Sequence, residues 1–134
     1  MIHCIALDDE PLALQVIVQY CSKISYLQLD KVFTNPDEAK DYLKHNKVDL
    51  LFLDIQMPEL TGLDFLKTIK NPPLVVLATA YSEYAVDSYE FENVVDYLLK
   101  PITFERFLKT ANRIFEILKL EPPSEQTVLA KEET

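Results

Sequence analysis

The sequence predicts an α/β fold, a doubly wound parallel sheet of five strands with five helices. Strand-like and helix-like segments alternate along the chain, and the strand-like segments are mostly short apolar runs rather than alternations of apolar and polar residues. Continuous apolar strands are typical of a parallel sheet that is covered on both faces. Right-handed crossovers through the intervening helices then give the doubly wound arrangement.

The first half of the chain contains three expected strands and two expected helices. Residues 2–7 form an apolar run, and Pro11 follows where the first turn of a helix tolerates proline. Apolar residues then recur at helical spacing as far as Cys21. The rest of this half is predicted to be a weaker strand, a short helix and a buried strand, at 27–33, 36–45 and 48–53.

The second half continues the alternation. Gly62 precedes a helix whose apolar residues extend to Ile69. The clearest amphipathic pattern of the chain runs from Phe104 to Leu118 and predicts the last helix. Between these two helices we expect a strand, a short helix and a strand, at 74–78, 83–90 and 94–99.

Length and composition indicate one domain, which we place at residues 1–120, followed by a linker or tail at 121–134. Hydrophobic residues make up 49% of the chain, which is enough for a buried core. The last segment is polar and contains Pro122 and Pro123, as linkers do. The formal net charge of -9 argues against direct binding of nucleic acid by this chain, since phosphate contacts need a basic face.

Several other classes of protein are excluded by the composition. Gly62 is the single glycine, whereas a P-loop and a dinucleotide-binding loop each need several. The apolar runs are too short to span a membrane, and the first residues lack the basic region of a signal peptide. Cys4 and Cys21 are expected to be packed, reduced thiols, which favours a cytoplasmic location. His3 and His45 have no ligand-like spacing, so no zinc site is predicted.

Acidic residues gather at one predicted edge of the sheet. Asp8 and Asp9 follow the first strand, and Asp54 closes the third. Carboxyl ends of parallel strands meet at one edge, where doubly wound folds bind their ligands. Like charges about 4 Å apart repel by about 4 kcal/mol at an effective dielectric near 20, so this cluster indicates a bound cation, and oxygen ligands favour Mg²⁺. Taken alone, Asp8 and Asp9 are better explained as loop charges or helix caps, and Asp54 is explained equally well as a strand-end carboxylate.

Asp54 is the candidate nucleophile of this cluster. An aspartate carboxylate can attack phosphorus to give an aspartyl phosphate, whose oxygens then need neutralisation. Lys100 is the candidate cation, and the bond to Pro101 is one of the few that can be cis, which would set the direction of the ammonium group. Thr79 can donate its hydroxyl to a phosphoryl oxygen, although strand propensity explains a threonine there equally well.

Four motifs together resemble the receiver domain of bacterial response regulators. They are Asp8-Asp9-Glu10-Pro11, Asp54 to Gly62, Thr79-Ala80, and Asp96 to Pro101. The resemblance covers residues 2 to about 119 with every motif in order, and implies the flavodoxin-like, CheY-like strand order 2-1-3-4-5. The segments from Thr79 to Ala85 and from Asp96 to Pro101 are further similar to receivers of the LytTR class, which normally carry a DNA-binding output domain.

The resemblance assigns the reactive residues. Asp54 would be the phosphoacceptor of a two-component system. Asp8, Asp9, Asp54 and the backbone carbonyl of Gln56 would hold Mg²⁺, with Asp9 rather than Asp8 preferred as the direct ligand.

The same resemblance assigns binding and switching roles. Thr79 and Lys100 would bind the phosphoryl group. Thr79 and Tyr97 would form the switch, with Tyr97 as the rotating aromatic that couples phosphorylation to the face made by the fourth helix, fifth strand and fifth helix. The side chains of Gln56 and Tyr81 would tune hydrolysis of the phosphoryl group.

The resemblance also implies partners. A sensor histidine kinase would donate the phosphoryl group, and a homodimer would form through the face of the fourth helix, fifth strand and fifth helix. The domain would catalyse only its own phosphorylation and dephosphorylation. Because no output domain follows residue 120, we expect transcriptional output to lie outside this chain, with a stand-alone receiver as the alternative.

Three competing functions fit the sequence less well. A phosphatase of the haloacid-dehalogenase type needs a second acid two positions after the nucleophile, where this chain has Gln56, and a helical cap insertion is also missing. An FMN carrier needs a phosphate loop rich in Ser, Thr and Gly, whereas the acidic residues 8–10 would repel phosphate. A phosphorylation-independent interaction module stays open, although the reactive residues are intact.

Overall fold

The computed structural model describes residues 1–81 and 91–119. The helix predicted at 83–90 and the tail predicted at 121–134 lie outside these residues. None of the described helices has both the length and the apolar character that crossing a bilayer requires. The elements in chain order are β1 (Ile2–Leu7), α1 (Pro11–Ser22), β2 (Leu27–Phe33), α2 (Pro36–His45), β3 (Leu50–Asp54), α3 (Gly62–Lys67), β4 (Leu74–Thr79), β5 (Val94–Leu99) and α5 (Phe104–Lys119).

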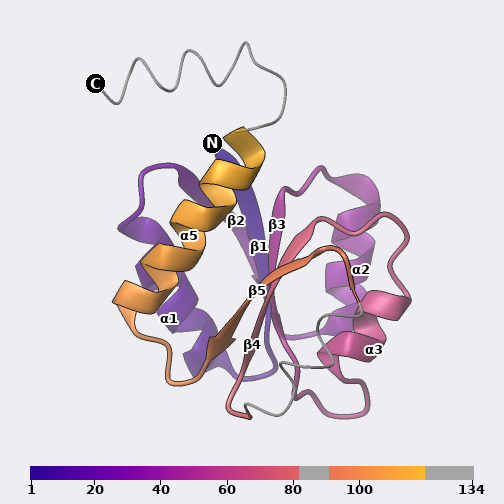
Figure 1. The fold of residues 1–134 in the computed structure, drawn as a ribbon. Helices are drawn as coiled ribbons and strands as arrows, with labels where there is room; N and C mark the ends of the chain where they lie inside the picture. Colours follow the sequence, from indigo (N-terminus) through magenta and orange to yellow (C-terminus); the bar gives the residue numbers. More distant parts are fainter. Residues whose placement is uncertain (82–90, 120–134) are drawn as a thin grey trace.

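The sheet has five strands in the order β2-β1-β3-β4-β5, and every neighbouring pair is parallel. The predicted α/β class and the strand order 2-1-3-4-5 are therefore confirmed. Figure 1 shows α1 and α5 on one face of the sheet and α2 and α3 on the other. Because both faces are covered, β3 is buried along its whole length, which explains its continuous apolar sequence.

Two separate cores hold the layers together, one on each face of the sheet. Under α1 and α5, the ring of Phe107 stacks on Phe52 with centroids 5.2 Å apart, and Ile114 is fully buried beside them. Under α2 and α3, Phe65 and Leu77 are buried in the second cluster. Each fully buried side chain of this size contributes about 1.5–3 kcal/mol through the hydrophobic effect.

Several predicted boundaries are wrong by one or two residues. The third strand ends at Asp54 rather than at residue 53, and the fourth ends at Thr79 rather than at residue 78. The third strand begins at Leu50 rather than at residue 48; just before it, the Asp49 carboxylate accepts the N–H of His3 at 2.9 Å, and the N–H of Asp49 donates to the His3 carbonyl at 2.8 Å. The third helix ends at Lys67 rather than at Ile69, because the N–H groups of Thr68 and Ile69 turn back to carbonyls only three residues earlier.

Side-chain caps explain where α2 and α3 begin. The Asn35 side chain accepts hydrogen bonds from the N–H groups of Asp37 and Glu38, and Pro36 occupies the first helical position. The Thr61 hydroxyl accepts the N–H of Asp64 at 3.1 Å in the same way. These polar residues therefore satisfy backbone donors that the helices themselves leave unpaired.

Gly62 is required by a close approach of backbone to backbone. A Cβ atom at this position would lie 2.3 Å from the carbonyl oxygen of Asp54 and 3.0 Å from Cα of Ile55. The loop has little room to move, since the N–H of Gly62 donates to the Ile55 carbonyl at 2.8 Å. The glycine thus lets the start of α3 pack directly on the end of β3.

We therefore expect Gly62→Ala to lower the free energy of unfolding by about 2 kcal/mol, the usual range for overpacking. Urea unfolding monitored by circular dichroism measures this. Lys67→Ala, an exposed change on the same helix, should stay close to wild type. Equal stability of Gly62→Ala and wild type would contradict the close approach.

Candidate functional site

The predicted site residues meet at the carboxyl edge of the sheet. Asp54 is the last residue of β3 and Thr79 the last of β4, while Asp8 and Lys100 come directly after β1 and β5. The strand register aligns these ends, with Leu7 opposite Leu53. Residues that are up to 92 positions apart in sequence therefore lie within hydrogen-bonding distance of one another.

Lys100 joins two of the carboxylates. Its Nζ donates to Oδ2 of Asp8 at 2.8 Å and to Oδ1 of Asp54 at 3.3 Å. The side chain of Asp54 is only 2% exposed and that of Lys100 20%. The peptide bond between Lys100 and Pro101 is cis. The ammonium group thus offsets part of the negative charge at this edge of the sheet.

Burial dominates the ionisation of Asp54. Its pKa is raised from 3.8 to about 7; loss of hydration is the largest cause, the negative charge of Asp8 and the neighbouring Asp9 carboxyl also raise it, and Lys100 lowers it. Burial also disfavours the charged form of Lys100, but its carboxylate partners outweigh burial and raise its pKa. One ammonium group therefore does not compensate all the negative charge that is gathered here.

Two carboxylate oxygens at this edge are buried and have no hydrogen-bond partner among the residues that the structure describes. They are Oδ1 of Asp9 and Oδ2 of Asp54. Two ionised carboxylates cannot hydrogen-bond each other, and an unpaired buried charge is strongly unfavourable. Asp8 differs, since Oδ1 accepts the N–H of Glu10 at 2.9 Å and Oδ2 accepts Lys100.

These unpartnered oxygens fit a divalent cation. Carboxylate oxygens of Asp8, Asp9 and Glu10 lie within 4.8 Å of one another. A hard, all-oxygen donor set of few protein ligands is the kind that Mg²⁺ prefers, since this ion keeps several of its waters. The alternative explanation, that Asp8 and Asp9 cap the next helix, is wrong, because α1 has no side-chain cap.

The remaining predicted residues surround Asp54. The N–H of Gln56 donates to Oδ1 of Asp54 at 3.3 Å, and its side chain lies in an exposed position. The buried hydroxyl of Thr79 accepts the N–H of Tyr81 at 3.2 Å. Tyr97 donates its hydroxyl to the carbonyl of Tyr81, so the predicted switch aromatic is tied to the segment that follows Thr79.

An apolar cavity of about 280 Å³ adjoins the site between α1 and residues 100–102. Asp8, Asp54 and Lys100 lie at its inner wall, and aliphatic side chains of α1 form much of the rest. Leu12, at the start of α1, is 75% exposed and lines the same cavity. The Asp54 carboxylate is therefore bordered by an apolar surface that is partly exposed.

The sequence analysis missed a polar network on the adjoining face of β5 and α5. Arg106 donates to both carboxylate oxygens of Asp96, at 2.8 and 3.1 Å, and to the carbonyl of Tyr97 at 3.0 Å. The buried Thr110 donates its hydroxyl to Asp96 at 2.7 Å. The four-residue spacing of Arg106 and Thr110 was the available signal, but only the fold brings Asp96 to them.

We expect Arg106→Ala to destabilise the protein by about 1 kcal/mol, because its exposed guanidinium is screened by water. Burial raises the pKa of Asp96, but hydrogen bonds from Arg106, Thr110 and Tyr97 lower it overall. This stabilisation is present above the ordinary value of 3.8 and is lost as the pH falls through the lower folded-state pKa. Urea unfolding should show that the difference in free energy of unfolding between Arg106→Ala and wild type is smaller in acid than at pH 7. A pH-independent difference, or an equal loss in the exposed-site variant Arg113→Ala, would contradict this.

Comparison with known proteins agrees with this geometry. Residues 4–112 match the family described as "Response regulator receiver domain". The sequence is 36% identical over 116 residues to the transcriptional regulatory protein BtsR of Escherichia coli (strain K12), covering 85% of this chain and 48% of that protein. It is 34% identical to the sensory transduction protein LytT of Bacillus anthracis, with 84% and 47% covered.

A solved structure is also similar. The response regulatory domain of protein mrkE from Klebsiella pneumoniae superposes with a TM-score of 0.80 at 29% identity, covering 90% of this chain and 100% of that one. The chain spans about half the length of the curated relatives it matches. On the family match, the sequence relatives and the shared fold, this chain belongs to the response regulator receiver domain family.

Proposed function

We propose that this domain is the phosphoacceptor of a two-component response regulator, with Asp54 as the residue that takes the phosphoryl group. The observation that carries this proposal is a buried carboxylate at the end of β3 with one oxygen on Lys100 and the other unpartnered. An oxygen of the ionised carboxylate attacks phosphorus, the new O–P bond forms, and the bond from phosphorus to the donor group breaks. The product is an aspartyl phosphate and the free donor.

Lys100 and Thr79 are the proposed binding residues for the transferred group. The Nζ of Lys100 contacts Asp54 at 3.3 Å, so after transfer it is close enough to donate a hydrogen bond to a phosphoryl oxygen on Asp54. Thr79 ends the neighbouring strand, and its hydroxyl, which accepts the N–H of Tyr81, can donate its own proton to that group. Movement of this hydroxyl would change its hydrogen bond with Tyr81. Because Tyr97, the proposed switch residue, donates to the Tyr81 carbonyl, the change would also affect Tyr97.

Asp9, Asp54 and the Gln56 carbonyl are the proposed ligands of Mg²⁺, with Asp8 assisting. Support comes from the two unpartnered oxygens, which belong to Asp9 and Asp54, while both oxygens of Asp8 already have partners. When bound, the ion supplies positive charge to the transferring oxygens. Gln56 and Tyr81 lie in exposed positions beside the site, which suits a role in controlling access of water.

The names of the relatives support a proposal for the output and the partners of this domain. The names of LytT and BtsR describe sensory transduction and transcriptional regulation. We therefore propose a cytoplasmic regulator in which residues 1–120 are the receiver, 121–134 a linker, and a LytTR-type DNA-binding output lies outside this chain. A sensor histidine kinase is the proposed donor, approaching across the apolar cavity beside Asp54. The face around β5 and α5 is the proposed dimer contact.

Intact-mass spectrometry after incubation with acetyl phosphate tests the function. With Mg²⁺ we expect a gain of one phosphoryl group, and peptide mapping should place it on the segment that contains Asp54. With EDTA the gain should fall at least tenfold. A protein that gains no phosphoryl group in either condition would instead be a phosphorylation-independent interaction module.

A further inference from the structure

A second cavity, of about 370 Å³, lies at the opposite edge of the sheet from Asp54. Its walls are the end of α2 with the loop before β3, and the loop between α3 and β4. Figure 1 shows α2 and α3 together on one face of the sheet. Because the loops precede β3 and β4 whereas Asp54 ends β3, the two sites are separated by about the length of a strand, roughly 17 Å.

Four lysines line this second cavity, and the cavity wall contains no aspartate or glutamate among the described residues. They are Lys40, Lys44, Lys47 and Lys70. The chain as a whole has 13 basic and 22 acidic side chains, so this local concentration of positive charge opposes the overall balance. None of the four makes an ion pair with a described residue.

Helix dipoles do not explain the cluster. Lys44 lies in the last turn of α2, where a positive charge is favourable. Lys40 is one turn earlier, however, and Lys47 and Lys70 lie beyond the ends of α2 and α3. The four side chains therefore gather positive charge around one cavity, and an anion bound there would be attracted by all of them.

The apolar part of the wall restricts the class of anion. Half-buried apolar residues complete the cavity, and they include Leu43, Val48, Ile69 and Pro73. A bare phosphate ion would leave these side chains without a partner, whereas a flat organic body would cover them. The cavity volume is also within the range of about 300–1,000 Å³ that is typical of small-molecule sites.

We propose that this cavity binds a small molecule that carries two or more phosphoryl groups on an apolar or aromatic body, the nucleoside diphosphate class. The lysines bind the phosphoryl oxygens as point charges, and the apolar wall contacts the body. A concave site of this size suits a small ligand better than an extended acidic polypeptide.

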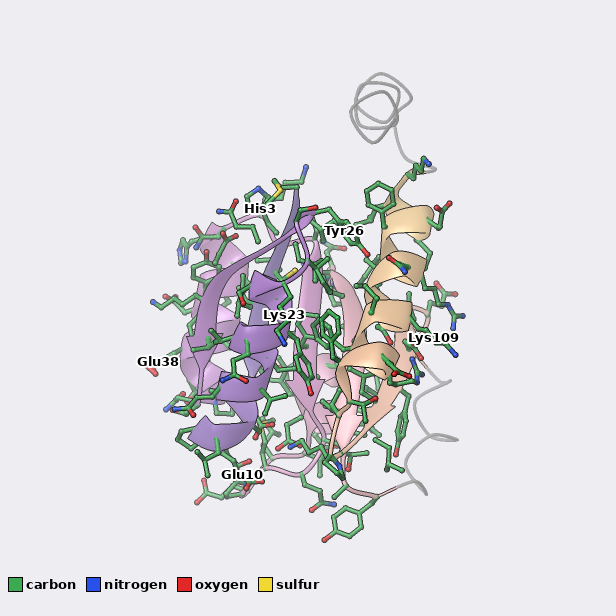
Figure 2. The ribbon with its side chains drawn as sticks, turned by 90° about the vertical axis from the view of Figure 1, so that its left-hand side faces the viewer. His3, Glu10, Lys23, Tyr26, Glu38 and Lys109 are labelled. Atoms are coloured by element: carbon green, nitrogen blue, oxygen red, sulfur yellow. The ribbon has the colours of Figure 1, made fainter. Side chains whose placement is uncertain are left out.

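Isothermal titration with ADP in low salt and EDTA tests the proposal, since EDTA removes metal-assisted binding at the acidic edge. We expect saturable binding of one ADP per chain, at least tenfold weaker in the double variant Lys44→Gln/Lys70→Gln. The matched control Lys23→Gln/Lys109→Gln changes the charge equally on the α1 and α5 side, where Figure 2 shows both lysines. This control variant should bind ADP with an affinity within twofold of that of wild type.

Two further ligands test the chemical class of the ligand, and one variant tests whether the site is separate from Asp54. Pyrophosphate and adenosine should each bind at least tenfold more weakly than ADP, because each engages only one part of the wall. Asp54→Asn should bind ADP as wild type does, which separates this site from the phosphoacceptor. Absence of saturable ADP binding, an equal loss in the control variant, or pyrophosphate binding as tight as that of ADP would each overturn the proposal. Circular dichroism verifies that the variants are folded.

Discussion

Asp54→Asn is expected to abolish phosphorylation while leaving the fold intact. The amide has nearly the shape of the carboxylate but lacks a nucleophilic oxygen anion, so no aspartyl phosphate can form. With acetyl phosphate and Mg²⁺, intact-mass spectrometry should show at least about 100-fold less phosphoryl uptake than in wild type. Circular dichroism should be unchanged, because the amide can still accept a hydrogen bond from Lys100.

The matched control for this variant is Asp41→Asn. Asp41 lies on α2 with its side chain 74% exposed, and the substitution makes the same change in charge. It should accept a phosphoryl group at the wild-type rate. Uptake by Asp54→Asn that equals that of the control would place the reactive group elsewhere in the chain and refute the assignment.

The second large effect is a loss of stability of the metal-free protein as the pH rises. Burial, with help from Asp8, raises the folded-state pKa of Asp54 from 3.8 to about 7. The folded protein therefore holds a proton more tightly than the unfolded chain does. The resulting stabilisation is fully present below pH 3.8 and is lost as the pH rises through about 7. A shift of this size corresponds to a loss on the order of 4 kcal/mol.

Asp54→Asn isolates this contribution because its amide does not titrate. Urea unfolding in EDTA at pH 5 and pH 8 should show the variant becoming progressively more stable relative to wild type as the pH rises. Mg²⁺ at pH 8 should restore wild type and have a much smaller effect on the variant, since a ligand that binds only the folded state stabilises it. A difference between the two proteins that is the same at both pH values would rule out a buried, uncompensated carboxylate.

Local sequence was sufficient for the elements because each carries its own signal. The continuous apolar runs of β1, β3 and β4 predict buried parallel strands, and Pro36 after Asn35 predicts the start of α2. The errors are confined to the ends of elements. Both the N–H and the carboxylate of Asp49, just before β3, bond the backbone of His3, and the last turn of α3 is tightened by hydrogen bonds to carbonyls three residues earlier.

For the acidic edge, strand ends alone predicted which residues meet. Asp8, Asp54, Thr79 and Lys100 each end or follow a strand, and parallel strands bring such positions to one edge. The sequence did not predict which carboxylate oxygens keep a partner. Nor did it predict that Asp96, Arg106 and Thr110 form one network, because Arg106 is one of several polar residues on α5 and a helical pattern does not reveal what lies opposite it.

The sequence by itself determined the fold class and the set of residues at the acidic edge, which depend on periodicity and on the order of segments along the chain. The strand order was implied by the resemblance of its motifs to receiver domains. Only the tertiary structure decided that Lys100 bridges Asp8 and Asp54, that Asp9 and Asp54 each keep a buried oxygen without a partner among the described residues, and that four lysines from α2 and two connections line one cavity. Distances, burial and unmet hydrogen bonds arise between segments, so they exist only once the layers have packed.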